Sequence, residues 1–429
     1  MHTTPLLAAV ILAGSAAAQV SLRDVSQLAR ARAERLRPKQ VAALQPFWGD
    51  LALEYRNNSQ FLNQRIEKAS QLGDSVVPML LEKLKPAQSG SEARNLASNC
   101  RRVLQRLDPS SFVDALVELA RGDHAIARSQ AIRLLGYTSA RQAAPVLTSL
   151  IDQVEGEDRL QAVRSLRLLR ARSVAPKIVK LLGTKDTKLR EEVLAYLSAA
   201  RAASVSATVV QALEAESSDR LLPAFIDYFR TSVSTDPVAT AALLPLLGRD
   251  RIDWQDTRNL VEALSRVAPK RHEPTIRALH ELIDGNETSS LAVQAAVSLR
   301  ALGDKQGITD LKRALDGKVR RNKRKASPYE QRARLRFAIG DFSNAVDDYE
   351  KLLEFSEGAA MTRRAYVGIL KAEARRERIQ SLVKNMKSSG MTPDELVELA
   401  ADDEPIGKCM GHERVQNFLK KLRKDRAPK

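Results

Sequence analysis

The chain has 429 residues, 44% of them hydrophobic and 28% charged, so it has enough apolar side chains for a folded core and too many for a disordered protein. Aromatic residues make up only 4%, a composition that favours short helices packed closely together in an all-α fold. The formal net charge of +17 points to an anionic partner, and the position of the charges decides which kind.

The N-terminal residues have the composition of a targeting segment. Residues 1–18 contain no Asp, Glu, Lys or Arg, and the apolar run from Pro5 to Gly14 is followed by three alanines. This pattern predicts a signal peptide that is removed before Gln19. A membrane anchor would need about 20 apolar residues, and the polar stretch from Ser21 comes too early for one. We therefore expect an exported protein of the periplasm or the extracellular space that does not span a membrane.

Only two cysteines are present, Cys100 and Cys409, so disulfides do not hold this fold together. We expect both to be single buried thiols, because residues near opposite ends of an elongated array lie too far apart to bond. Two cysteines and five histidines also provide no spacing typical of a structural zinc site. Neither a metal nor another cofactor is expected.

A repeat of 31 residues is visible between about Asp123 and Leu213. Its in-phase positions are Arg128, Arg159 and Arg190, then Ala131, Ala162 and Val193, then Pro145, Pro176 and Ala207, and finally Leu150, Leu181 and Ala212. Each unit is predicted to form two short amphipathic helices that bury their apolar faces only by stacking on neighbouring units. We expect the in-phase arginines to pair with the acids just before them, which are Asp123, Glu155 and Asp186.

Two copies of this repeat resemble a known family. The stretches 124–136 and 158–170, each followed by a loop and a second helix that begins with Ala-Pro, resemble HEAT repeats in the short form of the phycobilisome-lyase type. Degenerate copies extend on both sides, the last at 289–315. The resemblance implies an α-solenoid of about eight helical hairpins at 61–317, preceded by capping helices at 19–60. It implies little about function, because scaffolds, transport receptors, lyases and nucleic-acid enzymes share this architecture.

A dense basic segment follows the predicted array. Six of the eight residues from 318 to 325 are cationic, namely Lys318, Arg320, Arg321, Lys323, Arg324 and Lys325. Because like charges repel and the apolar periodicity stops near Leu315, we expect an extended, protease-sensitive linker at 318–328. The segment is either a solvated spacer or an electrostatic docking site for an acidic protein, an anionic polysaccharide or lipid headgroups. Nucleic acid is not expected as the partner, because no aromatic residue for base stacking lies among these cations.

The region after the basic segment resembles a tetratricopeptide (TPR) repeat, on the residues Tyr329, Ala333, Gly340, Phe342, Ala345, Tyr349 and Leu352. The resemblance implies TPR-like helical hairpins at 329–405. Within them, Thr392 to Glu395 form a capping-box sequence that starts a helix. A C-terminal capping helix with a basic tail is expected at 406–429.

The sequence contains no motif that predicts catalysis, since it has no glycine-rich phosphate loop, no nucleophile elbow and no paired histidines at metal-binding spacing. We therefore predict a non-catalytic scaffold or adaptor of the cell envelope that binds a protein partner through the solenoid surface. Two alternatives remain open. One is a HEAT-like enzyme of the lyase or DNA-glycosylase type, and the other is an envelope-surface protein held on anionic lipid or polysaccharide by residues 318–325.

Overall fold

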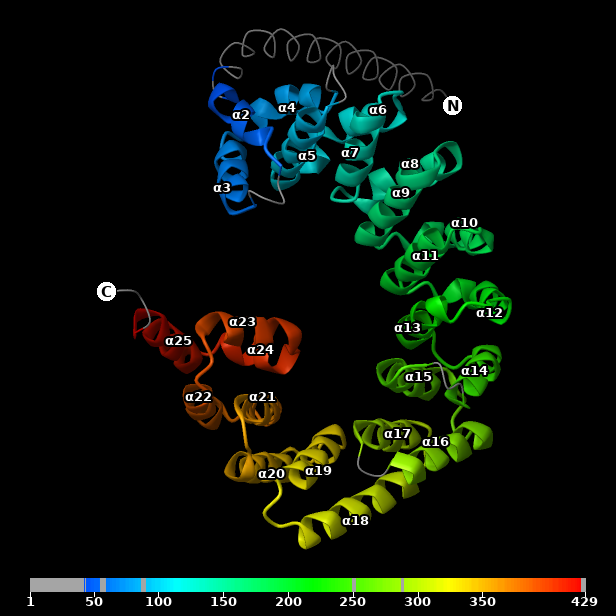
Figure 1. Cartoon of the computed structure of the whole chain (residues 1–429), viewed down its shortest axis with the longest axis vertical. Helices are drawn as coiled ribbons and strands as arrows, with labels where there is room; N and C mark the ends of the chain where they lie inside the picture. The colour runs from blue at the N-terminus through cyan, green and yellow to red at the C-terminus, as the bar shows by residue number, and fades with distance from the viewer. Residues whose placement is uncertain are drawn as a thin grey trace, which may run out of the picture. The chain divides into compact units, whose positions relative to one another are not determined.

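The computed structural model describes residues 42, 44–54, 59–85, 90–248, 252–286 and 289–425, and every regular element among them is a helix (Figure 1). The predicted signal peptide and most of the predicted capping region at 19–60 lie outside these residues. The chain divides after Ala202 into two compact units, each built from helical hairpins. The predicted all-α solenoid class is confirmed. No helix in the described part of the chain is long and apolar enough to cross a membrane.

The first unit contains a layer of four helices, α5, α7, α9 and α11, each of which contacts the next. A second set of helices covers this layer, because α6 packs on α7 and α8, and α8 packs on α9. The helices of this unit are α2 (Trp48–Leu51), α3 (Ser59–Ser70), α4 (Val77–Lys83), α5 (Ser91–Arg106), α6 (Val113–Arg121), α7 (Ala125–Leu135), α8 (Ala140–Gln153), α9 (Gly156–Leu169), α10 (Ala175–Ile178) and α11 (Thr187–Ala199). Short 3-10 turns precede or follow several of them, at η1 (Gln45–Phe47), η2 (Asp74–Val76), η3 (Pro109–Phe112), η4 (Arg172–Val174) and η5 (Val179–Gly183).

Small in-phase residues determine how closely this layer packs. Ala131 of α7, Ala162 of α9 and Val193 of α11 are fully buried, as the repeat predicts. At the contact between α7 and α9, Ser165 Oγ donates a hydrogen bond to the Ile132 carbonyl oxygen at 2.8 Å. Small side chains at these positions let neighbouring helix axes approach each other closely. The 31-residue repeat therefore specifies both burial and helix spacing in this unit.

Two of the in-phase arginines, Arg128 and Arg159, do not bind the acids predicted for them. Arg128 Nε donates to Asp158 in the first turn of α9 at 2.8 Å, and Arg159 Nε donates to the Val154 carbonyl oxygen at 2.8 Å. Asp186 instead accepts hydrogen bonds from two backbone N–H groups at the start of α11. The pairing predicted for Arg128 and Arg159 was wrong because helix ends expose free N–H and C=O groups, which attract the loop acid and the arginine separately. Both arginines nevertheless have structural roles.

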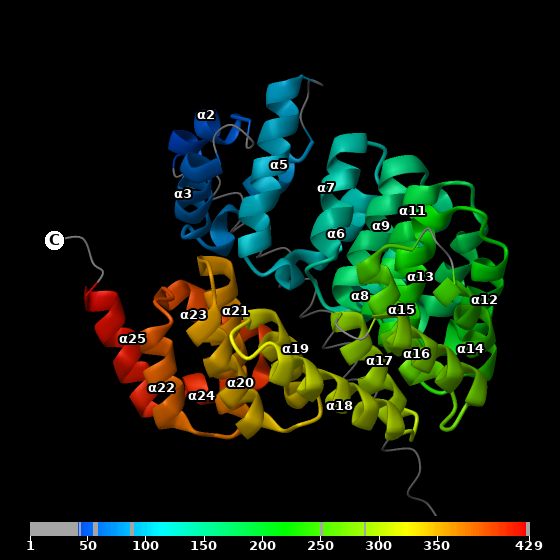
Figure 2. The same cartoon turned by 60° about the horizontal axis from the view of Figure 1, so that its bottom comes forward.

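In the second unit α13, α15 and α17 form one layer, and α19 contacts α17 at its end. α16 packs on α17 and α18, and Figure 2 shows the chain passing from α18 into the hairpin of α19 and α20. The helices are α12 (Ser206–Glu214), α13 (Leu222–Ser232), α14 (Pro237–Leu243), α15 (Trp254–Val267), α16 (Glu273–Asn286), α17 (Ser290–Ala301), α18 (Gln306–Arg321), α19 (Ala326–Ala338), α20 (Phe342–Phe355), α21 (Ala359–Arg375), α22 (Ile379–Ser388), α23 (Pro393–Asp402), α24 (Glu404–Met410) and α25 (Glu413–Asp425). The 3-10 turns are η6 (Ala203–Val205), η7 (Asp219–Leu221) and η8 (Leu244–Gly248).

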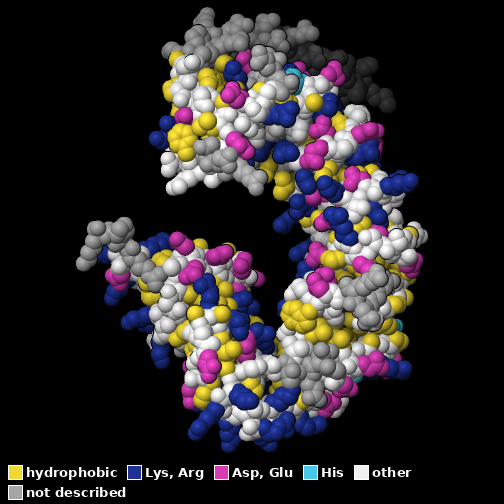
Figure 3. Space-filling view, in the orientation of Figure 1, with side chains coloured by type: hydrophobic (Ala, Val, Ile, Leu, Met, Phe, Trp, Pro, Cys, Tyr) yellow, Lys and Arg dark blue, Asp and Glu magenta, His cyan; other side chains and the backbone are white. Residues whose placement is uncertain are grey.

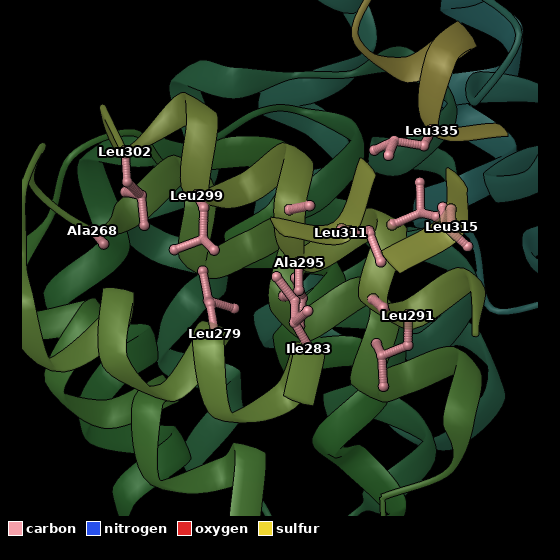
Figure 4. Packing of buried hydrophobic residues seen from close by; sticks show 14 residues of the cluster. Ala268, Leu279, Ile283, Leu291, Ala295, Leu299, Leu302, Leu311, Leu315 and Leu335 are labelled. Atoms are coloured by element: carbon pink, nitrogen blue, oxygen red, sulfur yellow. The ribbon is translucent and has the colours of Figure 1, made fainter. Parts of the chain in front are cut away.

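One hydrophobic cluster joins the HEAT-like helices to α19 (Figure 4). Its buried members include Leu279 and Ile283 of α16, Leu299 of α17, Leu311 and Leu315 of α18, and Leu335 of α19. Because Leu335 belongs to the first TPR-like helix, the two predicted repeat regions share a core at this point. They meet through packed side chains.

The TPR-like hairpin forms as its residues predict. Gly340, between α19 and α20, has φ +86°, a left-handed conformation that favours glycine. Ala345 is fully buried, and Tyr349 packs in the same cluster. Further along, Thr392 and Glu395 form the predicted capping box at the start of α23. Local sequence patterns therefore place the turn between α19 and α20 and the start of α23.

Both cysteines are free and buried, as predicted. Cys100 is fully buried in α5, and burial raises the pKa of its thiol to about 12. Cys409, in α24, packs in the C-terminal cluster beside Leu370 and Ile406. Because the thiolate is the reactive form, a thiol with so high a pKa is unreactive at neutral pH.

Candidate functional site

The basic segment predicted as an extended linker at 318–328 is mostly helical. α18 continues to Arg321, and α19 already begins at Ala326. Val319 explains the difference, because it lies one helical turn after Leu315 and its side chain is only 7% exposed. This side chain extends the buried face of α18 by another turn. The prediction of an extended conformation was therefore wrong.

The four residues between the two helices form a turn with several hydrogen bonds. Asn322 Nδ2 donates to the Lys318 carbonyl oxygen at 3.2 Å, and the Lys325 backbone N–H donates to the Asn322 carbonyl oxygen at 3.0 Å. The Tyr329 hydroxyl donates to the Lys323 carbonyl oxygen at 3.0 Å. The cations in this turn therefore project from an ordered backbone.

We call the six predicted cations the basic corner, which comprises Lys318, Arg320, Arg321, Lys323, Arg324 and Lys325. Lys318 is half-buried, and the other five side chains are exposed. Three of the six lie in the last turn of α18, where positive charge interacts favourably with the helix dipole. Figure 3 shows Lys and Arg side chains gathered over this end of α18. The structure thus brings together all the residues that the sequence singled out.

Neighbouring acids do not neutralise the basic corner. Residues 306–325 contain eight Lys and Arg but only two acids, Asp310 and Asp316. Asp310 accepts a hydrogen bond from Arg313 at 3.1 Å, and Asp316 accepts one from Arg332 at 2.9 Å. Within the described ranges, none of the six corner cations forms an ion pair. Their charge is available to a ligand.

A groove runs along α18 beside the basic corner, with a volume of about 620 Å³. We call it the α18 groove, and it is lined by Ile308, Thr309, Lys312, Arg313, Asp316, Gly317, Arg320 and Ile339. Only Arg320 belongs to the residues predicted from the sequence. Lys312 and Arg313 were missed, although their spacing of eight and seven residues from Arg320 places all three on one helix face. Ile308 and Ile339 add apolar surface to this cationic groove.

A buried ion network fixes α18 against the next two helices. Asp348 of α20 is 2% exposed and accepts hydrogen bonds from Arg332 at 2.6 and 2.9 Å and from Arg336 at 2.8 Å. Arg332 also reaches Asp316 of α18. Burial alone would lower the pKa of Arg332, but the hydrogen bonds to Asp348 and Asp316 raise it above its usual value. This network holds the backbone that carries the basic corner.

The chemistry that these residues support is anion binding. Asp316 is the only acid among the described residues that lines the α18 groove, and its carboxylate is bound to Arg332, so it is poorly placed to act as a general base. In the part of the chain that the structure covers, no three His, Cys, Asp or Glu side chains are arranged to hold a metal ion. Lysine and arginine side chains beside apolar surface instead suit a ligand with carboxylates.

Limited digestion with trypsin distinguishes this arrangement from an extended linker. We expect the first cuts in this region after Lys323, Arg324 or Lys325, which are exposed in the turn. Cleavage after Lys318 requires the last turn of α18 to unwind, because Val319 is buried. Mass spectrometry of the early fragments measures the order of the cuts. Fragments ending at Lys318 that appear as early as those ending at Arg324 would contradict an ordered helix end.

Comparisons with known proteins address the fold. A family model described as the PBS lyase HEAT-like repeat matches residues 291–317, which span most of α17 and α18. No curated protein matches the chain. A solved structure of an engineered protein from the Northeast Structural Genomics Consortium is similar at 15% sequence identity and a TM-score of 0.38, over 83% of this chain and 96% of that chain. The family-model match at 291–317 coincides with the degenerate repeat copy that the sequence placed at 289–315.

Proposed function

We propose that this protein is a non-catalytic binding scaffold of the cell envelope, and that the basic corner and the α18 groove dock an acidic segment of a partner protein. The observation that carries the proposal is the set of six cations at an ordered helix end and turn that form no ion pair with any described residue. Such a surface attracts and orients an acidic partner. Its ordered backbone lowers the conformational entropy that is lost on binding.

The groove favours a protein segment over the other anionic partners. Ile308 and Ile339 offer apolar contacts between the cations, which match the mixed side chains of an acidic peptide better than a surface of lipid headgroups. The name of the matching repeat also suggests a lyase. An enzyme would need an acid, base or nucleophile facing its substrate, and Asp316 is engaged with Arg332. The envelope location in this proposal rests on the signal peptide that the sequence predicts at 1–18.

The test compares two variants that lose the same charge at different places. The corner variant carries Gln at five exposed positions of the basic corner, which are Arg320, Arg321, Lys323, Arg324 and Lys325. The control variant carries Gln at five exposed lysines of α22 and α25, which are Lys384, Lys387, Lys420, Lys421 and Lys424. For a polyglutamate peptide, we expect the Kd of the corner variant to rise at least about tenfold, or about 1.4 kcal/mol, and to lose most of its salt dependence. The control variant should bind like the wild type.

Two outcomes would contradict this function. Equal loss of polyglutamate binding in both variants would show that only the net charge of the chain matters. Tighter binding to vesicles that contain phosphatidylglycerol than to polyglutamate would favour the lipid-surface alternative. In intact cells, a photo-crosslinker at Thr309 in the α18 groove should capture an acidic envelope protein, and the corner substitutions should abolish this capture.

A further inference from the structure

A second groove of about 460 Å³ lies between α15, α17 and α19, and we call it the Trp254 groove. It is lined by Trp254, Arg258, Ser290, Val293, Gln294, Val297, Arg334 and Ala338. Val293, Val297 and Ala338 supply aliphatic surface, and Trp254 is the first residue of α15. Figure 3 shows exposed hydrophobic side chains beside α15 and α17. The groove is separate from the basic corner and was not found from the sequence.

The Trp254 side chain is not required by the core of its own unit. It is 50% exposed, whereas Leu260 and Leu264 of the same helix are fully buried. Among the residues that the structure describes, no aromatic ring or cation stacks on its indole. A half-exposed tryptophan beside aliphatic surface is typical of the residues that dominate binding energy at protein interfaces. This ring is therefore positioned to pack on an apolar side chain from another molecule.

The charges around the groove determine what kind of segment fits it. Arg258 lies one helical turn after Trp254, is exposed, and has no ion pair within the described ranges. Arg334 binds Glu330 at 2.5 Å, but the same carboxylate also binds Arg364 at 3.0 Å, so one acid serves two arginines. Among the residues that the structure describes, no acidic side chain lines the groove. A ligand that places an apolar group in this groove therefore fits best when it also carries a carboxylate that can bind these arginines.

We propose that the Trp254 groove binds a short extended segment of a partner protein in which an aliphatic side chain is flanked by Asp or Glu. The aliphatic side chain packs between Trp254 and the valines of α17, and Arg258 and Arg334 bind the carboxylates. Ser290 and Gln294 are polar side chains at hydrogen-bonding reach of the backbone of a bound segment. A nucleic acid fits less well, because it needs successive aromatic platforms and this groove has one ring. This site is independent of the proposed docking at the basic corner.

The experiment uses the fluorescence of Trp254 itself. The chain has two tryptophans, so Trp48→Phe in the full-length protein leaves Trp254 as the only one. The probes are acetylated, amidated peptides with the sequence Gly-Gly-Glu-Leu-Asp-Gly-Gly, its amide counterpart with Gln and Asn, and a single-stranded thymidine oligonucleotide. We expect the acidic peptide to shift the emission to shorter wavelength and to bind about tenfold more tightly than the amide counterpart.

Matched variants assign the binding to this groove. In isothermal titration calorimetry, Trp254→Ala should abolish binding of the acidic peptide, and Arg258→Gln should weaken it about tenfold. Arg266→Gln on the exposed side of the same helix and Val238→Ala at an exposed position of α14 should bind like the wild type. Circular dichroism of each variant checks that the fold is intact.

Four results would overturn the proposal. The first is equal affinity for the acidic peptide and its amide counterpart. The second is binding that survives Trp254→Ala in a protein of unchanged circular dichroism. The third is tighter binding of the oligonucleotide than of the acidic peptide. Absence of any fluorescence change or heat with the acidic peptide would likewise reject this site, whatever happens to polyglutamate binding at the basic corner.

Discussion

Asp348→Ala is expected to destabilise the second unit by about 3–5 kcal/mol. The carboxylate is 2% exposed and holds both Arg332 and Arg336, whose side chains are 15% and 16% exposed. Removing it leaves two guanidinium groups that are mostly shielded from water and have lost their main acidic partner. Asp316 of α18 remains near both arginines, but it is a single acid and lies at 4.0 Å from Arg336.

Urea unfolding followed by circular dichroism measures the free energy of unfolding, and hydrogen exchange of the amides of α19 and α20 locates the loss. Asp347→Ala is the control, because this neighbour on α20 is exposed and forms no ion pair in the described part of the chain. It should change the free energy of unfolding by less than about 0.5 kcal/mol. If the Asp348 and Asp347 variants unfold at the same urea concentration, the ion network does not hold α18, α19 and α20 together.

Gly368→Ala in α21 is expected to destabilise the protein by about 1–3 kcal/mol, although alanine is the better helix former. A β-carbon at this position would lie 2.4 Å from the Tyr349 ring of α20, far inside van der Waals contact. Tyr349 is only 7% exposed, so its ring has little room to move away. The close approach of the two helices therefore requires a glycine at this position, although glycine has a low helix propensity.

Gly317→Ala in α18 is the matched control, because the nearest atom to its β-carbon is an Arg321 guanidinium nitrogen at 3.6 Å. This change should stabilise the protein by about 0.5–1 kcal/mol, in the direction given by helix propensity. Thermal unfolding of both variants shows whether each substitution stabilises or destabilises the protein. A double variant, Gly368→Ala with Tyr349→Leu, should lose less than the sum of its single changes, since the smaller side chain relieves the clash. Stabilisation by Gly368→Ala alone would show that the helices are not in close contact.

The repeat and the TPR-like hairpin could be predicted because their signals are local. Ala131, Ala162 and Val193 recur at a fixed spacing and are buried, and Gly340 lies where a tight turn between two helices needs a left-handed residue. The in-phase Arg128 could be placed on its helix but not paired with its partner. Its acid, Asp158, comes from a different hairpin, and the choice among nearby acids depends on how the hairpins stack.

The candidate site was predicted in its charges and not in its conformation. The count of cations in the sequence located the basic corner. Repulsion between these like charges was expected to keep the segment extended, but the burial of Val319 continues α18 to its end. The sequence also placed Trp254 within the predicted array at 61–317 without marking it as exposed, since a large apolar residue is expected in the core by default. Its exposure became visible only when the side chains that pack around α15 were known.

By itself, the amino-acid sequence determined the helical class, the spacing of the hairpins and the position of the densest positive charge. These properties follow from periodicity and composition within some 30 residues, where the chain's own covalent geometry decides which side chains share a face. The tertiary structure decided which charges stay unpaired and where grooves open. Among the described residues, Lys312 and Arg320 have no acidic partner, because the Asp316 carboxylate binds Arg332 of the next helix. Free charge and open apolar surface are what remains after distant helices have packed, so no local pattern specifies them.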